Sequence, residues 1–163
     1  MSPDLAGVPV HVVTVSDRSA AGTRADASGP VLADAFRALG AEVSTRIVPD
    51  GIDSVREAIA AASGADARIV VTCGGTGLSP RDLTPEATAP LLDRDLPGLA
   101  ARLRAVDAEA VPTAVLSRGL AGVTAAGVIV VNLAGSVGAA RSGAAVLGAV
   151  LPHAVRQLDG EDH

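Results

Sequence analysis

The chain has 163 residues, of which 48% are hydrophobic and 19% are charged, and its formal net charge is −5. This length and composition exclude a disordered chain and favour one domain with a substantial core, while the low charged fraction favours an oligomer, unless alanine-rich helices account for it. Nucleic-acid binding is not expected, because the chain lacks Trp and Tyr and has no basic stripe.

Strand and helix patterns alternate along the first half of the chain. Residues 8–15 form a nearly continuous β-branched run, which is typical of a strand covered on both faces. Helical spacing and alternation then predict a helix at 29–39, a less buried strand at 42–48, a helix at 53–63 with Asp53 as its N-cap, and a strand at 68–73. This order indicates parallel strands joined by right-handed crossovers.

The pattern resumes near the C-terminus with a strand at 128–131 and a long helical region at 136–158, broken or kinked at Pro152. No internal repeat or linker interrupts the sequence. We therefore expect a single three-layer α/β domain over residues 1–163, with a core of about 8–158 and a mostly parallel sheet flanked by helices.

Several classes of protein are not indicated. Residues 1–7 lack the basic and apolar regions of a signal peptide, and no apolar run approaches the length that spans a membrane. The one cysteine, Cys73, cannot form an internal disulfide and is expected to be a small buried apolar residue. We expect a soluble, cytoplasmic protein without a membrane partner.

Ligands of open α/β sheets bind beyond the carboxyl ends of the strands. Three loops expected at that edge combine Gly with Ser or Thr, which lets backbone N–H groups approach an anion: 16–29, 74–86 and 132–143. The alternative is that their glycines only make tight turns. Because the chain has no lysine and "GGTGLS" lacks the GxGxxG spacing, neither a Walker loop nor a dinucleotide fingerprint is present.

Two carboxylates are expected near the same crevice. Asp50 follows a strand and Asp82 ends the Gly-rich loop, so a divalent cation such as Mg²⁺ would be needed between them and a phosphate. The alternatives are a turn at 49–51 and an ion pair or N-cap role for Asp82. Arg81 would balance a phosphate or pair with Asp82, and Thr84 is expected to be an N-cap.

The motifs of this chain resemble those of the molybdopterin adenylyltransferase family, which includes the bacterial Mog and MoaB proteins and the G domains of gephyrin and plant Cnx. The resemblance covers about residues 8–158 in the family's order. It rests on "VSDR" (15–18), "DASG" (26–29), "GGTG-x₃-RD-x-TPEAT" (74–88), "DRDLPG" (93–98), "LSR" (116–118) and "NLAGS" (132–136).

The resemblance implies an activity. Such proteins transfer AMP from ATP to the terminal phosphate of molybdopterin with Mg²⁺ and release pyrophosphate, and a related domain or enzyme then inserts molybdate. It also implies a homotrimer, which would suit the low charged fraction.

The resemblance further implies roles for particular residues. Asp50 and Asp82 match the two acidic residues required for transfer, through Mg²⁺, and Ser117 matches a serine on the pterin side. The remaining matches are the phosphate loop (Gly74, Gly75, Thr76 and Gly77), the loop closing the molybdopterin pocket (Gly135 and Ser136), and the nucleotide and phosphate environment (Asp17, Ser28 and Gly29).

One loop departs from the family pattern. Where the family usually shows "LPGSP", residues 133–137 read "LAGSV", so Ala134 and Val137 replace two prolines. This predicts a less rigid pterin end, since each missing proline returns about 0.4–1 kcal/mol of chain entropy to the unfolded state. The alternative function is therefore a trimeric molybdopterin carrier or scaffold without catalysis. An unrelated nucleotide-binding α/β domain would require the motif order to be coincidental.

Overall fold

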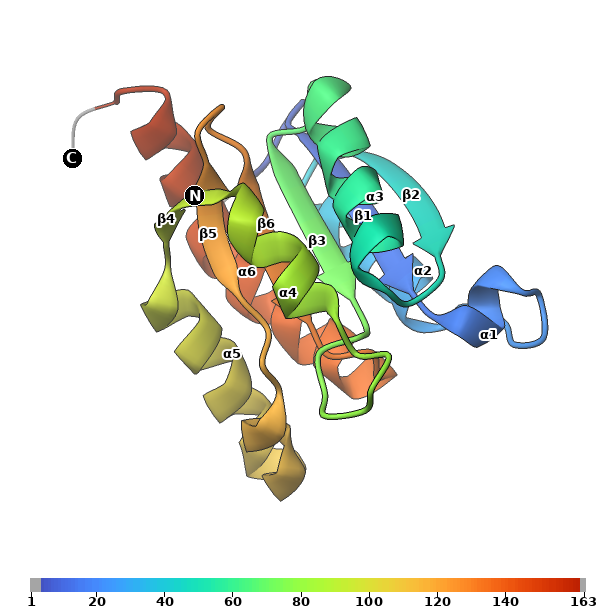
Figure 1. The fold of residues 1–163 in the computed structure, drawn as a ribbon. Helices are drawn as coiled ribbons and strands as arrows, with labels where there is room; N and C mark the ends of the chain where they lie inside the picture. The colour runs from blue at the N-terminus through green and yellow to red at the C-terminus, as the bar shows by residue number, and fades with distance from the viewer. Residues whose placement is uncertain (1–3, 162–163) are drawn as a thin grey trace.

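Six strands form one sheet in the order β2-β1-β3-β6-β5-β4 in the computed structural model, which describes residues 4–161 (Figure 1). Strands β1, β2, β3 and β6 pair in parallel, whereas β5 is antiparallel to both β4 and β6. The expected mostly parallel sheet is confirmed. The strands are β1 (Pro9–Val15), β2 (Glu42–Val48), β3 (Ile69–Cys73), β4 (Leu92–Asp95), β5 (Ala121–Thr124) and β6 (Ile129–Leu133).

Helices cover both faces of the sheet, which confirms the three-layer architecture (Figure 1). One face packs against α2, α5 and α6, and the other packs against α3 and α4. The helices are α1 (Asp17–Ala20), α2 (Ser28–Ala38), α3 (Ile52–Gly64), α4 (Thr84–Thr88), α5 (Pro97–Ala110) and α6 (Val137–Leu158), with 3₁₀ turns η1 (Ala89–Leu91) and η2 (Pro112–Leu116).

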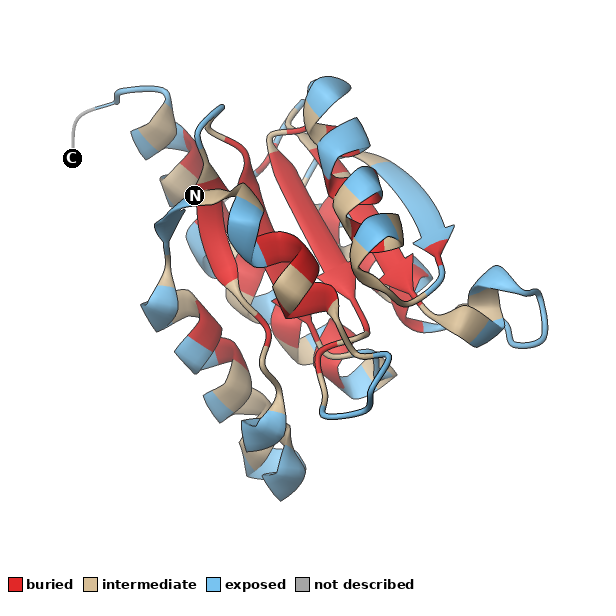
Figure 2. Cartoon of the chain, viewed as in Figure 1, coloured by how far each residue is buried: buried red, intermediate tan, exposed pale blue. Residues whose placement is uncertain are grey.

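The buried strands divide their side chains between the two layers. In β3, Ile69 and Val71 pack toward α2 and α6, while Val70 packs toward α3, because successive side chains of a strand point to opposite faces. Figure 2 shows β3 and β6 buried along their length and β2 largely exposed at the sheet edge. The less buried character expected of residues 42–48 is thus confirmed.

The structure differs from the sequence-based expectations in local detail. Gly51, not Asp53, is the N-cap of α3, and Asp53 lies in the first turn, where its charge favours the helix dipole. Of the two alternatives for Pro152, a break is wrong, because helix α6 continues through this buried proline to Leu158. The segment from 92 to 124 holds β4, α5, η2 and β5, none of which the periodicity predicted.

Among residues 4–161, no helix combines the length and hydropathy that crossing a bilayer requires.

A buried amide joins the strands to the layer of α4. Asn132 in β6 donates from Nδ2 to Thr72 Oγ1 at 2.9 Å and to Thr88 Oγ1 at 3.1 Å, and its Oδ1 accepts from Leu120 N at 3.1 Å. All three side chains are buried. The network links β3, β6 and α4 just below the edge where the three Gly-containing loops begin.

Asn132→Leu is expected to lower the free energy of unfolding by about 2–3 kcal/mol, since it leaves the Thr72 hydroxyl and the Leu120 N–H without partners in the core. For a domain of this size that corresponds to a melting temperature about 4–12 °C lower, measured by circular dichroism. Thr45→Val on the exposed strand β2 is the control and should change little. Equal melting temperatures for the two variants would contradict this role for the network.

Candidate functional site

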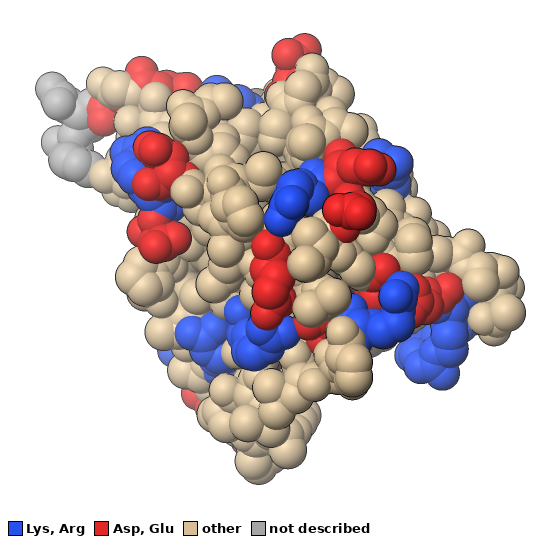
Figure 3. All heavy atoms as spheres, in the orientation of Figure 1, with Lys and Arg blue, Asp and Glu red and all other residues tan. Residues whose placement is uncertain are grey.

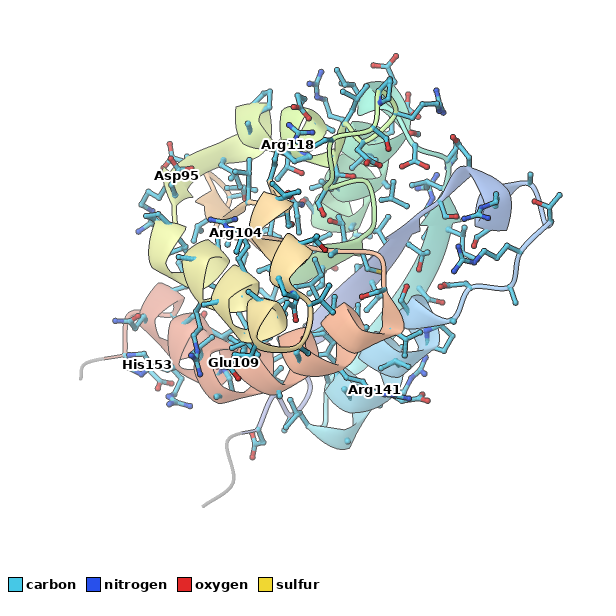
Figure 4. The ribbon with its side chains drawn as sticks, turned by 90° about the horizontal axis from the view of Figure 1, so that it is seen from below. Asp95, Arg104, Glu109, Arg118, Arg141 and His153 are labelled. Atoms are coloured by element: carbon cyan, nitrogen blue, oxygen red, sulfur yellow. The ribbon has the colours of Figure 1, made fainter. Side chains whose placement is uncertain are left out.

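Three loops meet at one end of the sheet. Strands β1, β3 and β6 are parallel neighbours, so the segments that follow them emerge at the same edge. Together they line a pocket of about 1000 Å³, and Figure 4 looks onto this end of the molecule. The predicted site residues on its wall are Asp17, Ser28, Asp50, Gly74, Gly75, Thr76, Gly77, Asp82, Ser117, Gly135 and Ser136.

In the loop after β3, the carbonyl oxygens accept hydrogen bonds from the protein, whereas several N–H groups of the described chain are unpaired. The Gly74 and Gly75 oxygens accept from the Thr84 hydroxyl and N–H, and the oxygens of Thr76 and Gly77 accept from Arg118. Within residues 4–161 the N–H groups of residues 75–77 have no hydrogen-bond partner. Unpaired N–H groups at a pocket wall form a concave anion site, so this loop can bind a phosphate.

Thr84 fixes the glycine loop rather than capping a helix. Its buried hydroxyl donates to the Gly74 oxygen at 2.9 Å, while Leu83 occupies the N-cap position of α4 without a side-chain cap. The N-cap expectation for Thr84 is therefore wrong. The proline that follows is at the start of α4, as predicted.

Arg118 connects the glycine loop to α4 and was not assigned a role from the sequence. Its Nε donates to the Gly77 oxygen at 3.0 Å and its Nη2 to the Asp82 oxygen at 2.7 Å, while Glu86 on α4 pairs with its guanidinium. Figure 4 shows Arg118 beside the loop and α4, with Arg104 on α5 further along the same side. Arg118 also lowers the pKa of the Glu86 carboxyl through this hydrogen bond. The pair thus holds both ends of the 77–82 segment.

Asp50 and Asp17 are joined by two hydrogen bonds, each from the backbone N–H of one residue to the carboxylate of the other. The Asp17 N–H donates to Asp50 Oδ2 at 3.0 Å, and the Asp50 N–H donates to Asp17 Oδ1 at 3.1 Å. Arg81 binds both oxygens of Asp17 at 2.7 and 2.8 Å and also the Asp50 carbonyl oxygen at 2.8 Å. Arg81 therefore pairs with Asp17 and not with Asp82, and its hydrogen bonds lower the pKa of Asp17.

Each of the two predicted metal-binding carboxylates is anchored by one oxygen. Asp50 Oδ2 accepts from the Asp17 N–H, and Asp82 Oδ2 accepts from the Ser79 N–H at 3.2 Å. In the described part of the chain, the Oδ1 atom of each has no hydrogen-bond donor. Burial raises the pKa of Asp50, and the charges of Asp17 and Asp82 add to that effect. A cation at Asp50 would offset this unfavourable charge.

The donor set fits Mg²⁺ completed by ligand oxygens. Magnesium is usually bound through one or two carboxylates plus phosphate oxygens and water, rather than by an all-protein cage. Residues 4–161 contain no group of three or more His, Cys, Asp or Glu side chains that could hold a metal alone. Asp50 and Asp82 would therefore hold the ion only together with a phosphate bound at the same pocket.

The third loop brings the start of α6 to the pocket. Ser136 is the N-cap, with its hydroxyl accepting from the Ala139 N–H at 3.0 Å, and Val137 is the first helical residue. Gly135 lies against the glycine loop, since a Cβ placed there would be 3.2 Å from Gly74 Cα. A helix N-terminus favours a negative charge. The helix thus begins at Val137 although proline is absent there.

Gly29 is the one predicted site residue that does not line the pocket. It is buried, and its N–H donates to Asp26 Oδ1 at 3.0 Å, while Thr14 donates to the other oxygen of Asp26 at 2.7 Å. Ser28 lines the pocket, and its hydroxyl contacts Cys73. Burial raises the pKa of the Cys73 thiol, which fits the apolar role expected for it.

One mainly apolar part of the pocket wall was not predicted from the sequence. It is formed by the end of α5 and by η2, and its residues are mainly apolar: Val106, Ala110, Val111, Ala114 and Leu116. Asp107 on the same wall accepts a hydrogen bond from Ser142 of α6. Such a surface suits the face of a ring, which the anion-binding loops do not.

Comparison with known proteins identifies relatives over most of the chain. The family described as "Probable molybdopterin binding domain" matches residues 11–153. The "Molybdopterin adenylyltransferase" of Pyrococcus furiosus is 38% identical over 149 residues, which are 89% of this chain and 88% of that protein. The "Molybdenum cofactor biosynthesis bifunctional protein" of Synechococcus elongatus is 39% identical over 160 residues, covering 98% of this chain but 50% of the relative.

Solved structures agree in fold. The molybdopterin biosynthesis Mog protein of Mycobacterium ulcerans superposes with a TM-score of 0.87 at 40% identity, covering 93% of this chain and 99% of that one. The chain spans about half the length of the Synechococcus relative and about a quarter of "Molybdenum cofactor synthesis protein cinnamon" of Drosophila melanogaster. The longer relatives therefore contain regions with no counterpart in this chain.

Proposed function

The chain belongs to the molybdopterin-binding domain family, and we propose that it is a molybdopterin adenylyltransferase of molybdenum cofactor biosynthesis. Its substrates would be ATP and molybdopterin. An oxygen of the molybdopterin terminal phosphate forms a bond to the α-phosphorus of ATP, the bond from that phosphorus to the β-bridging oxygen breaks, and pyrophosphate leaves with the electron pair. The observation that supports this proposal best is the row of unpaired N–H groups at residues 75–77, on the same pocket wall as Asp50 and Asp82. One oxygen of each of these carboxylates accepts a backbone hydrogen bond.

The protein's part in this reaction is positioning and electrostatics. The N–H groups of residues 75–77 bind a phosphate at the reacting end, and the N-terminus of α6 with Ser136 favours a second negative group. Asp50 and Asp82 would hold Mg²⁺, which neutralises phosphate charge when bound. Ser117, whose hydroxyl donates to Thr76 Oγ1 at 3.1 Å, joins the glycine loop to the apolar wall. We propose that the pterin ring lies against that wall.

The proposal is tested with purified protein, molybdopterin, ATP and Mg²⁺, following adenylylated pterin and pyrophosphate in equal amounts. Product that forms with Mg²⁺ and stops on addition of a chelator is the expected result. Tight molybdopterin binding without product, at any metal concentration, would instead identify a carrier. Absence of molybdopterin binding would overturn both functions.

We further propose that the protein acts in the cytoplasm as a homotrimer and delivers its product to a molybdate-inserting enzyme. Exposed large apolar side chains that do not line the pocket support an assembly, because contact with another subunit would remove them from water: Ile47, Leu78, Val115 and Val150. The molar mass in solution, measured by light scattering, decides between trimer and monomer.

A further inference from the structure

Acidic side chains outnumber basic ones on the pocket wall. Five carboxylates lie on its wall, from Asp17, Asp26, Asp50, Asp82 and Asp107, whereas the basic side chains on it are Arg18 and Arg24. Both arginines come from the loop after β1. A pocket that binds polyphosphate needs positive charge. Among the described residues of the pocket wall, the guanidinium groups of Arg18 and Arg24 are its source.

Within residues 4–161 the guanidinium groups of these arginines are unpaired, in contrast to two of the acids beside them. Asp17 is bound by Arg81, and both oxygens of Asp26 are occupied by Thr14 and Gly29. In the described residues 4–161, no hydrogen bond or ion pair is formed by either guanidinium, and both residues are exposed. Figure 3 shows basic atoms beside the α1 segment, at the lower right of that face and next to acidic atoms.

The backbone nevertheless holds the two arginines together. The Arg18 carbonyl oxygen accepts from Thr23 N at 3.0 Å, from Thr23 Oγ1 at 3.1 Å and from Arg24 N at 3.3 Å. Gly22, with a φ of 76°, lets the chain turn back at this point. The backbones of two residues six apart in sequence are thereby held together, and both residues line the pocket.

We propose that Arg18 and Arg24 bind the two phosphates of ATP that leave as pyrophosphate, an inference that rests on the proposed adenylyl transfer. Guanidinium groups match phosphate oxygens through paired N–H donors. Arg18 directly follows Asp17, whose N–H binds Asp50, so the arginines stand next to the predicted metal-binding carboxylates. Among the described residues on the pocket wall, the part formed by α5 and η2 is mainly apolar and bears no basic side chain, so the α1 loop supplies the basic side chains that would complement the N–H groups of residues 75–77.

Calorimetric titration with inorganic pyrophosphate and Mg²⁺ tests this assignment without turnover. We expect each of Arg18→Ala and Arg24→Ala to weaken pyrophosphate binding about 10-fold, and the double variant about 100-fold, at one fixed salt concentration. Molybdopterin affinity should stay within about twofold of wild type. The matched control is Arg102→Ala, an exposed arginine on α5 that is absent from the pocket wall.

Arg18→Lys with Arg24→Lys keeps both charges but removes the forked donors, and should recover only part of the affinity. Equal pyrophosphate binding by wild type and the double alanine variant would overturn the inference. So would an equal loss of molybdopterin and pyrophosphate affinity. Because pyrophosphate binding is measured without catalysis, a protein that fails to adenylylate molybdopterin yet binds pyrophosphate through these arginines would overturn only the proposed function.

Discussion

Asp82→Asn is expected to lower the rate of adenylyl transfer at least ~100-fold while leaving molybdopterin affinity near that of wild type. The amide oxygen can still accept from the Ser79 N–H, so the loop keeps its anchor. The substitution removes the negative charge of the Asp82 carboxylate, whose Oδ1 accepts no hydrogen bond within the described residues. Removal of one preorganised electrostatic group from an active site typically costs ~10²–10³ in turnover. Single-turnover rates at saturating ATP and Mg²⁺ measure the effect.

Asp95→Asn is the matched control, since Asp95 is an exposed carboxylate on β4 outside the pocket wall, and its rate should equal that of wild type. A second readout is Asp50, whose pKa is raised chiefly by burial and further by the charges of Asp17 and Asp82. Loss of the Asp82 charge should therefore lower the pKa of Asp50, measured by carboxyl ¹³C shifts. Normal turnover with an unchanged Asp50 pKa would show that the two carboxylates do not act together.

The sequence predicted the edge of the sheet where the site lies. The β-branched runs at residues 8–15 and 68–73 indicate strands buried on both faces, and such strands are parallel in α/β folds, so their carboxyl ends share an edge. The Gly-containing loops that follow them were for that reason expected to meet, and they line one pocket. Period and composition are sufficient for this step because burial dictates both.

The contacts that fix the site were not predictable in the same way. Arg118 binds the carbonyl oxygens of Gly77 and Asp82, and Arg81 binds Asp17, a residue 64 positions away. Backbone acceptors leave no trace in residue identity, and a neighbouring carboxylate such as Asp82 looks like the nearer partner for Arg81. The one available signal was an arginine beside an assigned serine at 117–118, which the periodicity could not interpret.

The apolar wall escaped prediction for a different reason. Helix α5 buries only Ala100 and Leu103 and carries charged residues on several sides, so its sequence lacks a clear apolar stripe. Two valines that follow this helix are also exposed: Val111, which precedes the 3₁₀ turn η2, and Val115 within it. A surface that is completed by a ligand or by another subunit keeps apolar residues exposed, and patterns that depend on core burial do not detect it.

Gly74→Ala is expected to destabilise the fold by about 4 kcal/mol, which is near the upper end of what a single substitution costs. Gly74 has a φ of 112°, and a Cβ at this position would lie 2.2 Å from the Val15 carbonyl oxygen. That oxygen belongs to the backbone of β1, so it cannot turn aside as a side chain would. For a domain of this length, the melting temperature should fall by about 8–16 °C.

Gly127→Ala separates the energetic cost of the steric clash from the cost of placing alanine in a left-handed backbone conformation. Gly127 also has a positive φ, of 81°, but a Cβ there meets nothing within 4 Å, so only the left-handed conformation is penalised, by about 1 kcal/mol. The difference between the two variants in urea denaturation therefore measures how closely the glycine loop approaches β1. If Gly74→Ala costs no more than Gly127→Ala, then the loop moves freely away from Val15. Its N–H groups would then not be held in advance for a phosphate, and the electrostatic basis proposed for catalysis would fail.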